Sequence, residues 1–97
     1  MSIPRTDEAA VRHIVRALLA DGWELVCVDD GGDEPEPTTT ETSVMEAVFS
    51  VDCSRLYVKR GTERGWVFFV LGNDPEEVAC DYTTNLTVVD KVTGEWL

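Results

Sequence analysis

The chain has 97 residues, of which 43% are hydrophobic, enough for one folded domain with a core. Its formal net charge of −11 disfavours direct binding to nucleic acid, because such binding needs a basic surface. We find no apolar run close to the roughly 20 residues that span a membrane, and no apolar stretch typical of a secretory signal. We therefore expect one cytoplasmic domain, residues 1–97, away from membranes.

The first predicted element is a helix that starts at Thr6 or Asp7, either of which can cap it. Gly22 follows the helix as a natural C-terminal cap. His13 lies outside the apolar stripe, and we expect it to be exposed. The stripe itself follows helical spacing at Val11, Ile14, Val15, Leu18 and Leu19.

The next segment alternates between strand and turn signals. Residues 23–28 predict a first strand, and the Asp and Gly residues at 29–32 predict a turn. Residues 33–41 predict an edge strand or, alternatively, a loop. We favour the strand because Pro35 and Pro37 are two apart, so both missing N–H groups point to the same outer side.

A short helix is predicted at about Val44–Val51, because Ser43 and Glu46 have the spacing of a capping box. The β-forming residues in this segment leave a strand as the alternative. Residues 52–54 predict a break, residues 56–60 a strand and residues 61–65 a turn.

The stretch 65–85 predicts the central hairpin of the sheet. Both alternating sets within Trp66–Leu71 are apolar, which is typical of a central strand covered on both sides. In the partner strand, residues 78–83, Val78, Cys80 and Tyr82 share one face. The C-terminal segment has helix-compatible spacing, but its Thr, Val and Gly content leaves its helical state open.

These elements predict an α+β fold with a mainly antiparallel sheet of four or five strands packed against the N-terminal helix. The expected order is α-ββ-α-βββ, followed by the undecided C-terminal segment.

Catalytic and metal-binding patterns are absent from the sequence. Cys27, Cys53 and Cys80 contain no C-x-x-C pair, and we expect Cys27 and Cys80 to be buried in a reducing compartment. His13 is the only histidine, and no nucleophile lies near it in the sequence. We therefore expect no enzyme activity, no catalytic residue, no metal and no cofactor.

The charge is concentrated in one third of the chain. Residues 21–52 contain ten acidic residues and neither Lys nor Arg. This pattern indicates either an acidic interaction surface or a solvated loop.

The sequence also resembles a group of small acidic proteins encoded by phages, prophages and plasmids. The likeness covers roughly residues 23–86 and implies this type of fold and a mobile-element origin in a bacterial host cell, with no catalytic site. The proline-rich acidic run at 33–37 departs from the group's pattern. The shared motifs are an acidic Asp-Gly turn, a helix ending in Phe-Ser-x-Asp, a Gly-Asn turn and an Asp-Tyr-Thr step, at Asp30–Gly31, Phe49–Asp52, Gly72–Asn73 and Asp81–Thr83.

We therefore predict a non-enzymatic inhibitor that presents an acidic surface to a basic, nucleic-acid-binding host protein, such as a CRISPR–Cas component. Anti-CRISPR proteins and other DNA mimics are similar in size and acidity. The alternatives are a small phage accessory or adaptor protein whose acidity serves only solubility, and a metal-binding or hydrolytic protein. The residues predicted to contact the partner are Asp29, Asp30, Asp33, Glu34, Glu36, Glu41 and Glu46.

Overall fold

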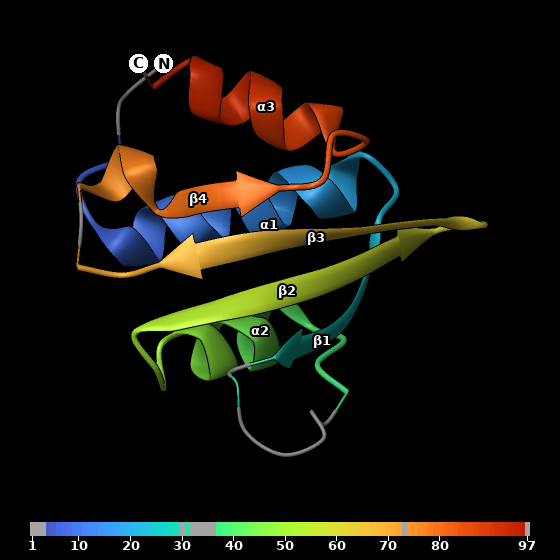
Figure 1. The fold of residues 1–97 in the computed structure, drawn as a ribbon, viewed down its shortest axis with the longest axis horizontal. Helices are drawn as coiled ribbons and strands as arrows, with labels where there is room; N and C mark the ends of the chain where they lie inside the picture. The colour runs from blue at the N-terminus through green and yellow to red at the C-terminus, as the bar shows by residue number, and fades with distance from the viewer. Residues whose placement is uncertain (1–3, 30, 32–36, 73, 97) are drawn as a thin grey trace.

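A computed structural model describes residues 4–29, 31, 37–72 and 74–96. It shows an α+β fold with a four-stranded antiparallel sheet in the order β1-β2-β3-β4, which confirms the predicted fold class (Figure 1). Within the described ranges, no helix combines the length and the apolar character needed to cross a membrane. The elements are α1 Asp7–Ala20, β1 Glu24–Asp29, α2 Glu41–Val48, β2 Cys53–Arg60, β3 Glu63–Val70, the 3-10 helix η1 Pro75–Glu77, β4 Ala79–Tyr82 and α3 Thr87–Gly94.

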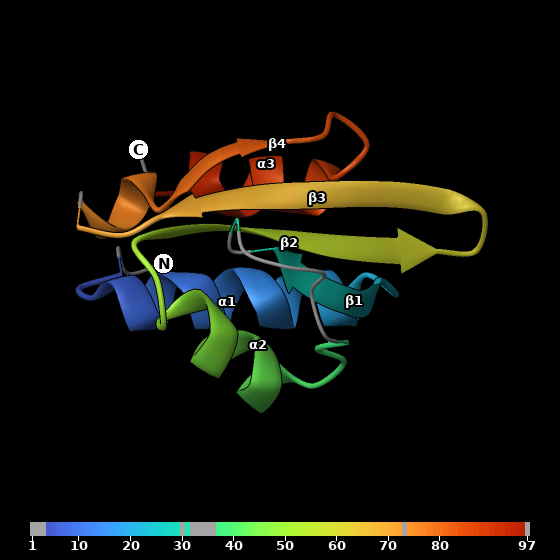
Figure 2. The ribbon, with the colours of Figure 1, turned by 60° about the horizontal axis from the view of Figure 1, so that its bottom comes forward.

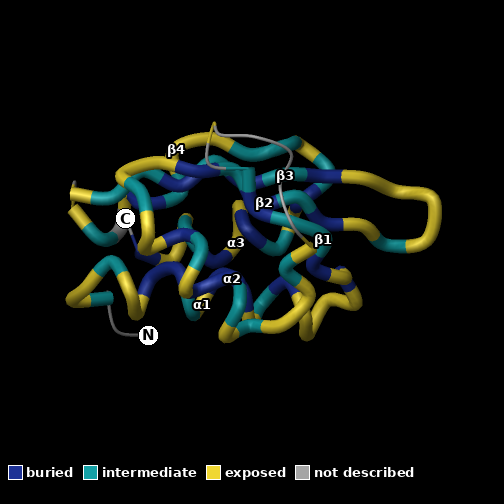
Figure 3. Tube along the Cα trace, turned by 90° about the horizontal axis from the view of Figure 1, so that it is seen from below, coloured by how far each residue is buried: buried dark blue, intermediate teal, exposed yellow. Residues whose placement is uncertain are grey.

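The core lies between the sheet and the helices. Helices α1 and α2 cover the same face of the sheet (Figure 2), and α3 packs against α1 over that face. The burial pattern follows strand alternation, since every second residue of β2 and β3 is buried (Figure 3). The buried sheet residues are Leu25, Val28, Ser54, Leu56, Val58, Val67 and Phe69.

The predicted N-terminal helix is confirmed. The backbone N–H of Ala9 donates to Thr6 Oγ1 at 3.0 Å, so Thr6 is the N-cap. Gly22 follows the helix with φ of +90°, a conformation that favours glycine. His13 is exposed, as expected, and its ring lies edge-on to Trp96 with 5.8 Å between the ring centroids.

The second helix forms earlier than predicted. It covers Glu41–Val48 instead of Val44–Val51, and Thr40 is its N-cap. The predicted capping box of Ser43 with Glu46 is wrong, because the box consists of Thr40 and Ser43. Ser43 replaces the usual Glu or Gln at the third helical position, and its hydroxyl accepts from the Thr40 N–H at 3.2 Å.

The β2–β3 hairpin is longer than the sequence predicted. Strand β2 starts at Cys53, so the expected break at 52–54 is wrong, and Gly61 and Thr62 alone form the turn. Gly65 lies within β3. A Cβ added there would come 2.8 Å from Leu86 Cδ2, which explains a glycine inside a strand.

Strand β3 is central in the sheet, as predicted, with β2 and β4 as its neighbours. The expectation that this strand is covered on both sides is not met by the described residues, whose helices lie on one face of the sheet. Val67 and Phe69 are fully buried beneath the helices, whereas Trp66, Phe68 and Val70 are half-buried on the opposite face. Among the described residues, the apolar pattern on both faces of β3 therefore occurs with helices on one face only.

Strand β4 pairs with β3 through an irregularity between Phe68 and Phe69. This irregularity breaks the alternation predicted for residues 78–83. Val78 is buried, but Cys80 is exposed, which contradicts the expected buried thiol, and Cys27 is half-buried. The open question about the C-terminal segment is settled, since α3 forms and buries Val89.

The predicted edge strand at 33–41 falls mostly outside the described residues. In the part that the structure describes, Pro37 forms an isolated bridge with Cys27, and the Thr38 N–H donates to the Val26 carbonyl at 3.0 Å. Residues 38–40 form no strand, and α2 begins at Glu41.

Candidate functional site

Three of the seven residues predicted to contact a partner lie in the described part of the chain. Asp29 ends β1, and its Oδ1 accepts from the Gly31 N–H at 2.9 Å. Glu41 begins α2, and Glu46 is exposed further along the same helix. The other four, Asp30, Asp33, Glu34 and Glu36, lie outside the described residues.

Glu41 faces α1 rather than open solvent. Its two carboxylate oxygens lie 2.6 Å from Arg16 Nε and 3.6 Å from Arg12 Nη1. Arg12 also contacts Glu8 at 3.1 Å, one turn earlier on α1. Arginines of the first helix therefore offset an acidic residue from the middle third of the chain.

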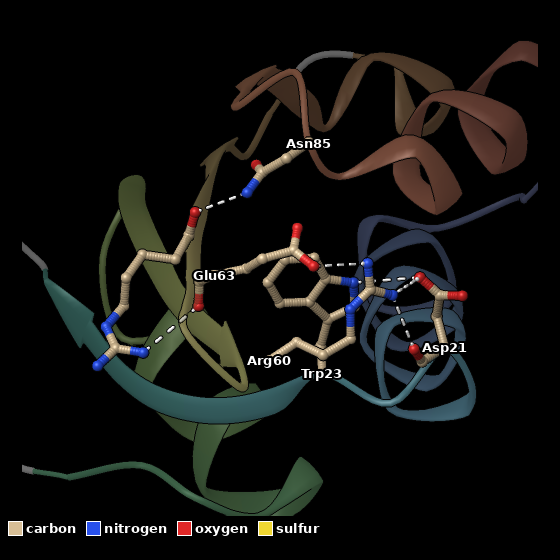
Figure 4. A network of polar contacts seen from close by, with 6 residues as sticks. Asp21, Trp23, Arg60, Glu63 and Asn85 are labelled. Atoms are coloured by element: carbon tan, nitrogen blue, oxygen red, sulfur yellow. Dashed lines mark hydrogen bonds and ion pairs between the residues drawn. The ribbon is translucent and has the colours of Figure 1, made fainter.

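The sheet end nearest the β2–β3 turn holds a network of paired charges (Figure 4). Arg60 Nη1 donates to Asp21 Oδ2 at 2.8 Å and to the Asp21 carbonyl at 3.0 Å, and Nη2 donates to Glu63 at 3.2 Å. The Arg60 guanidinium lies 4.5 Å from the centroid of the Trp23 ring, whose N–H also donates to Asp21. Glu24 and Lys59 make a looser pair at 3.7 Å.

We call this region the paired end, defined by Asp21, Trp23, Glu24, Lys59, Arg60 and Glu63. Two of its carboxylates, Asp21 and Glu24, belong to the acidic third identified in the sequence. Their cationic partners come from β2, more than 30 residues later in the chain. Cations from another part of the chain therefore offset part of the negative charge of the acidic third, residues 21–52.

Other carboxylates gather at the opposite end of the sheet, where β1 and β3 finish and β2 and β4 begin (left in Figure 1). The Gly72 N–H donates to Asp7 Oδ2 at 3.1 Å, which brings the start of α1 to the β3–β4 connection. The Leu71 N–H donates to the Asp52 carbonyl at 2.8 Å, which brings the start of β2 there as well. We call this region the acidic end, defined by Asp7, Asp29, Asp52, Asp74 and Glu77.

The carboxylates of the acidic end form no ion pair within the described ranges, although Arg55 is the cross-strand neighbour of Asp29. No Lys, Arg or His nitrogen of these ranges lies within 4.0 Å of any of them. Arg5 precedes α1 on this side and is exposed without forming an ion pair in the described structure. Five carboxylates without an ion pair in the described structure therefore lie at this end of the sheet, and four others, Glu46, Asp81, Asp90 and Glu95, lie elsewhere on the surface.

Four residues of the acidic end were missed from the sequence. Asp7, Asp74 and Glu77 lie outside the acidic third, and Asp52 lies at its margin. The sequence did hold one topological signal. In three consecutive antiparallel strands, the connection between the second and third strands lies at the same end of the sheet as the start of the first strand. The position of the helix start beside that connection depends on packing, which no sequence pattern specified.

The sheet also has an open face, which the described helices do not cover. It is formed by Glu24, Cys27 and Asp29 of β1, Cys53, Arg55, Tyr57 and Lys59 of β2, Arg64, Trp66, Phe68 and Val70 of β3, and Asp81 of β4. Arg55 lies 4.6 Å from the Trp66 ring centroid and 5.6 Å from that of Phe68. No described residue accepts a hydrogen bond from its buried Nε.

The thiol of Cys27, which lies on this face, has a shifted pKa. Burial, and then the negative charge of Asp29, raise the pKa of Cys27 above its ordinary value. Across the described ranges, no group of three or more His, Cys, Asp or Glu side chains is arranged to hold a metal ion.

Comparisons with known protein families, with curated proteins and with solved structures found no match to this chain.

Proposed function

We propose that this chain is a non-enzymatic binding protein that presents its acidic end to the basic, nucleic-acid-binding surface of a host protein. Inhibition would follow, because the same basic surface could not hold nucleic acid at the same time. The resemblance to small phage and plasmid proteins supports the further proposal that the inhibitor is of the anti-CRISPR or DNA-mimic type.

The observation that carries the proposal is the group of five carboxylates at the acidic end, none of which forms an ion pair in the described structure. Asp21, Glu24 and Glu41 are within reach of cations of the same chain, whereas the five carboxylates of the acidic end are not. Carboxylates that form no ion pair within their own chain remain available to external Lys and Arg.

The spacing of neighbouring strands at the acidic end suits contact with a partner surface that binds nucleic-acid phosphates. Neighbouring strands are about 4.8 Å apart, a distance comparable to the spacing of phosphates along one nucleic-acid strand. Acidic side chains at the ends of adjacent strands therefore offer a row of negative charges to a basic groove. Nucleic acid itself would be repelled by the net charge of −11.

The test is capture of partners from a bacterial host lysate, followed by competition with DNA. We expect an identified nucleic-acid-binding partner whose binding weakens as salt rises and which DNA displaces. The double variant Asp52→Asn/Asp74→Asn should weaken binding at least about tenfold, because two charges leave the contact surface.

A matched control removes the same charge from the paired end. The variant Glu24→Gln/Glu63→Gln has the same net charge and should bind almost as the wild type does. A third variant, with Asp29, Asp30, Asp33, Glu34 and Glu36 neutralised, tests the sequence-based prediction separately. If all three variants bind equally and DNA does not compete, acidity serves only solubility and the accessory or adaptor alternative replaces this proposal.

A further inference from the structure

We propose that the open face is a self-association surface through which two copies of this chain form a dimer. The inference rests on the aromatic rings and on Arg55 and Asp81 of the sheet face, none of which belongs to the acidic end, so it does not depend on the proposed function. Its starting point is the unusual composition of this face.

Large aromatic side chains occupy the middle of the open face. Tyr57 and Trp66 are direct cross-strand partners, and Phe68 follows on β3, all three half-buried. Among the described residues, no helix packs on this side. Clusters of exposed apolar surface mark contact sites, and Tyr, Trp and Arg are the residue types that dominate binding energy at interfaces.

The charge of the open face differs from that of the rest of the molecule. It carries Arg55, Lys59 and Arg64 and also Glu24, Asp29 and Asp81, so its formal charge is zero, whereas the chain as a whole carries −11. A neutral face attracts neither nucleic acid nor a strongly charged protein. It is also the surface on which two copies of this acidic chain repel each other least.

The strand register makes the face complementary to itself. Asp29, Arg55, Phe68 and Asp81 form one row across the four strands, with Phe68 on the central β3. A twofold axis along β3 places Phe68 opposite Phe68 of the second copy. Since β2 and β4 flank β3, the same axis places Arg55 opposite Asp81 of the second copy, on both sides.

Arg55 is suited to this pairing. Its guanidinium is held by the Trp66 and Phe68 rings, and no hydrogen-bond or ion-pair partner exists for it in the described structure. An arginine that forms no ion pair within its own chain gains from a carboxylate that another molecule supplies to its guanidinium. In the dimer, Asp81 of the second copy supplies it.

The dimer is expected to be of modest affinity. Strands β2 and β3 have eight residues each, β1 has six and β4 has four. At about 3.3 Å per residue and about 4.8 Å between strands they give a face of roughly 400 Å² per copy, in the range of weak, transient interfaces. We therefore expect a dissociation constant on the order of 10 µM. Packing of two such sheets face to face, with strands aligned within about 30°, is a common arrangement in proteins.

Sedimentation velocity at protein concentrations from roughly 1 to 300 µM tests the proposal, since that range spans the expected dissociation constant. We expect a monomer–dimer equilibrium that tightens as salt rises, because salt screens the repulsion between two acidic chains. Trp66→Ser should weaken the dimer at least about tenfold, as loss of a central interface aromatic does.

Charge reversal tests the register without removing the aromatic side chains. Arg55→Asp and Asp81→Arg should each weaken the dimer roughly tenfold, and the two together should restore most of the affinity. Lys91→Asp, on α3 and away from the open face, is the control and should have little effect. Thermal unfolding of each variant shows whether it is folded.

Two results would overturn the proposal. One is that the protein remains monomeric at all these concentrations in high salt. This result would contradict the proposal both if the face is free and if another part of the chain covers it. The other is a dimer that Trp66→Ser and both charge reversals leave unchanged.

Discussion

At the paired end, Arg60 holds Asp21 and Glu63 above the ring of Trp23, while at the acidic end five carboxylates have no cation of the described chain within ion-pair distance. Both ends border the same sheet, and both are rich in acidic residues. They differ in the residues that β2 supplies to each. Strand β2 finishes in Lys59 and Arg60, which pair with Glu24 and Asp21, whereas Arg55 near its start stacks on Trp66 and Phe68 and forms no ion pair in the described structure.

The difference shows that charge counted along the sequence is a poor guide to charge on the surface. The acidic third contains no Lys or Arg, yet Asp21, Glu24 and Glu41 find cations on β2 and α1. Asp74 and Glu77 belong to a segment with less net negative charge than the acidic third, but they form no ion pair in the described structure. Tertiary pairing, and not the local run, decides which carboxylates are available to a partner.

The largest effect on stability is expected from Trp23, which lies beneath the ion pairs of the paired end and is only 2% exposed. Trp23→Ala should lower the free energy of unfolding by about 3–5 kcal/mol, since it leaves a cavity in the core. Trp23→Phe keeps most of the packing and loses the N–H that donates to Asp21, so its cost should be smaller. Chemical denaturation measures both; equal costs for the two variants would contradict a packing role.

The next effect concerns Arg60 itself. Arg60→Ala should lower the free energy of unfolding by about 1–2 kcal/mol, because it removes a stacked cation and a donor to the Asp21 carbonyl. The side chain is 37% exposed, so solvent screening limits the ion-pair part of that cost. A double-mutant cycle with Asp21→Ala should give a coupling energy below about 1 kcal/mol; a larger value would mean that the pair is effectively buried.

The sequence predicted the fold class, the first helix and the central hairpin because those elements have clear periodicity and turn residues. The start of α2 was missed because Ser43 was assigned as the cap, whereas Thr40 three residues earlier fills that role. The exposure of Cys80 was missed because a register irregularity at Phe68/Phe69 leaves no trace in the alternation. The acidic end was missed because it assembles from four separate segments, which only packing brings together.

A smaller effect, with the opposite sign, is expected at the acidic end. The variant Asp52→Asn/Asp74→Asn should raise the free energy of unfolding by at most about 0.5 kcal/mol, because unpaired like charges oppose folding. The same measurement on Glu24→Gln should show no gain, since Glu24 has Lys59 as a partner. A clear loss of stability in the first variant would mean that the acidic end has structural contacts beyond those described.

The smallest effect is expected in the reactivity of Cys27. This residue lies on β1 between Glu24 of the paired end and Asp29 of the acidic end, so its reaction rate compares the influence of the two ends. Since the thiolate is the reactive form, the raised pKa of Cys27 and its partial burial should make it react with iodoacetamide at pH 8 more slowly than the exposed Cys53 and Cys80. Asp29→Asn removes the negative charge that contributes to the raised pKa and should speed the Cys27 reaction by roughly a factor of two.

Glu24→Gln is the matched control, because it removes the same charge from the other end of β1, where Lys59 already offsets it. It should leave the Cys27 rate unchanged, and in denaturant the three cysteines should react at similar rates. Mass spectrometry of peptides over a labelling time course gives each rate separately. An equal change from Asp29→Asn and Glu24→Gln would show that Cys27 responds to the net charge of the whole chain, so that the two ends do not differ electrostatically at this distance.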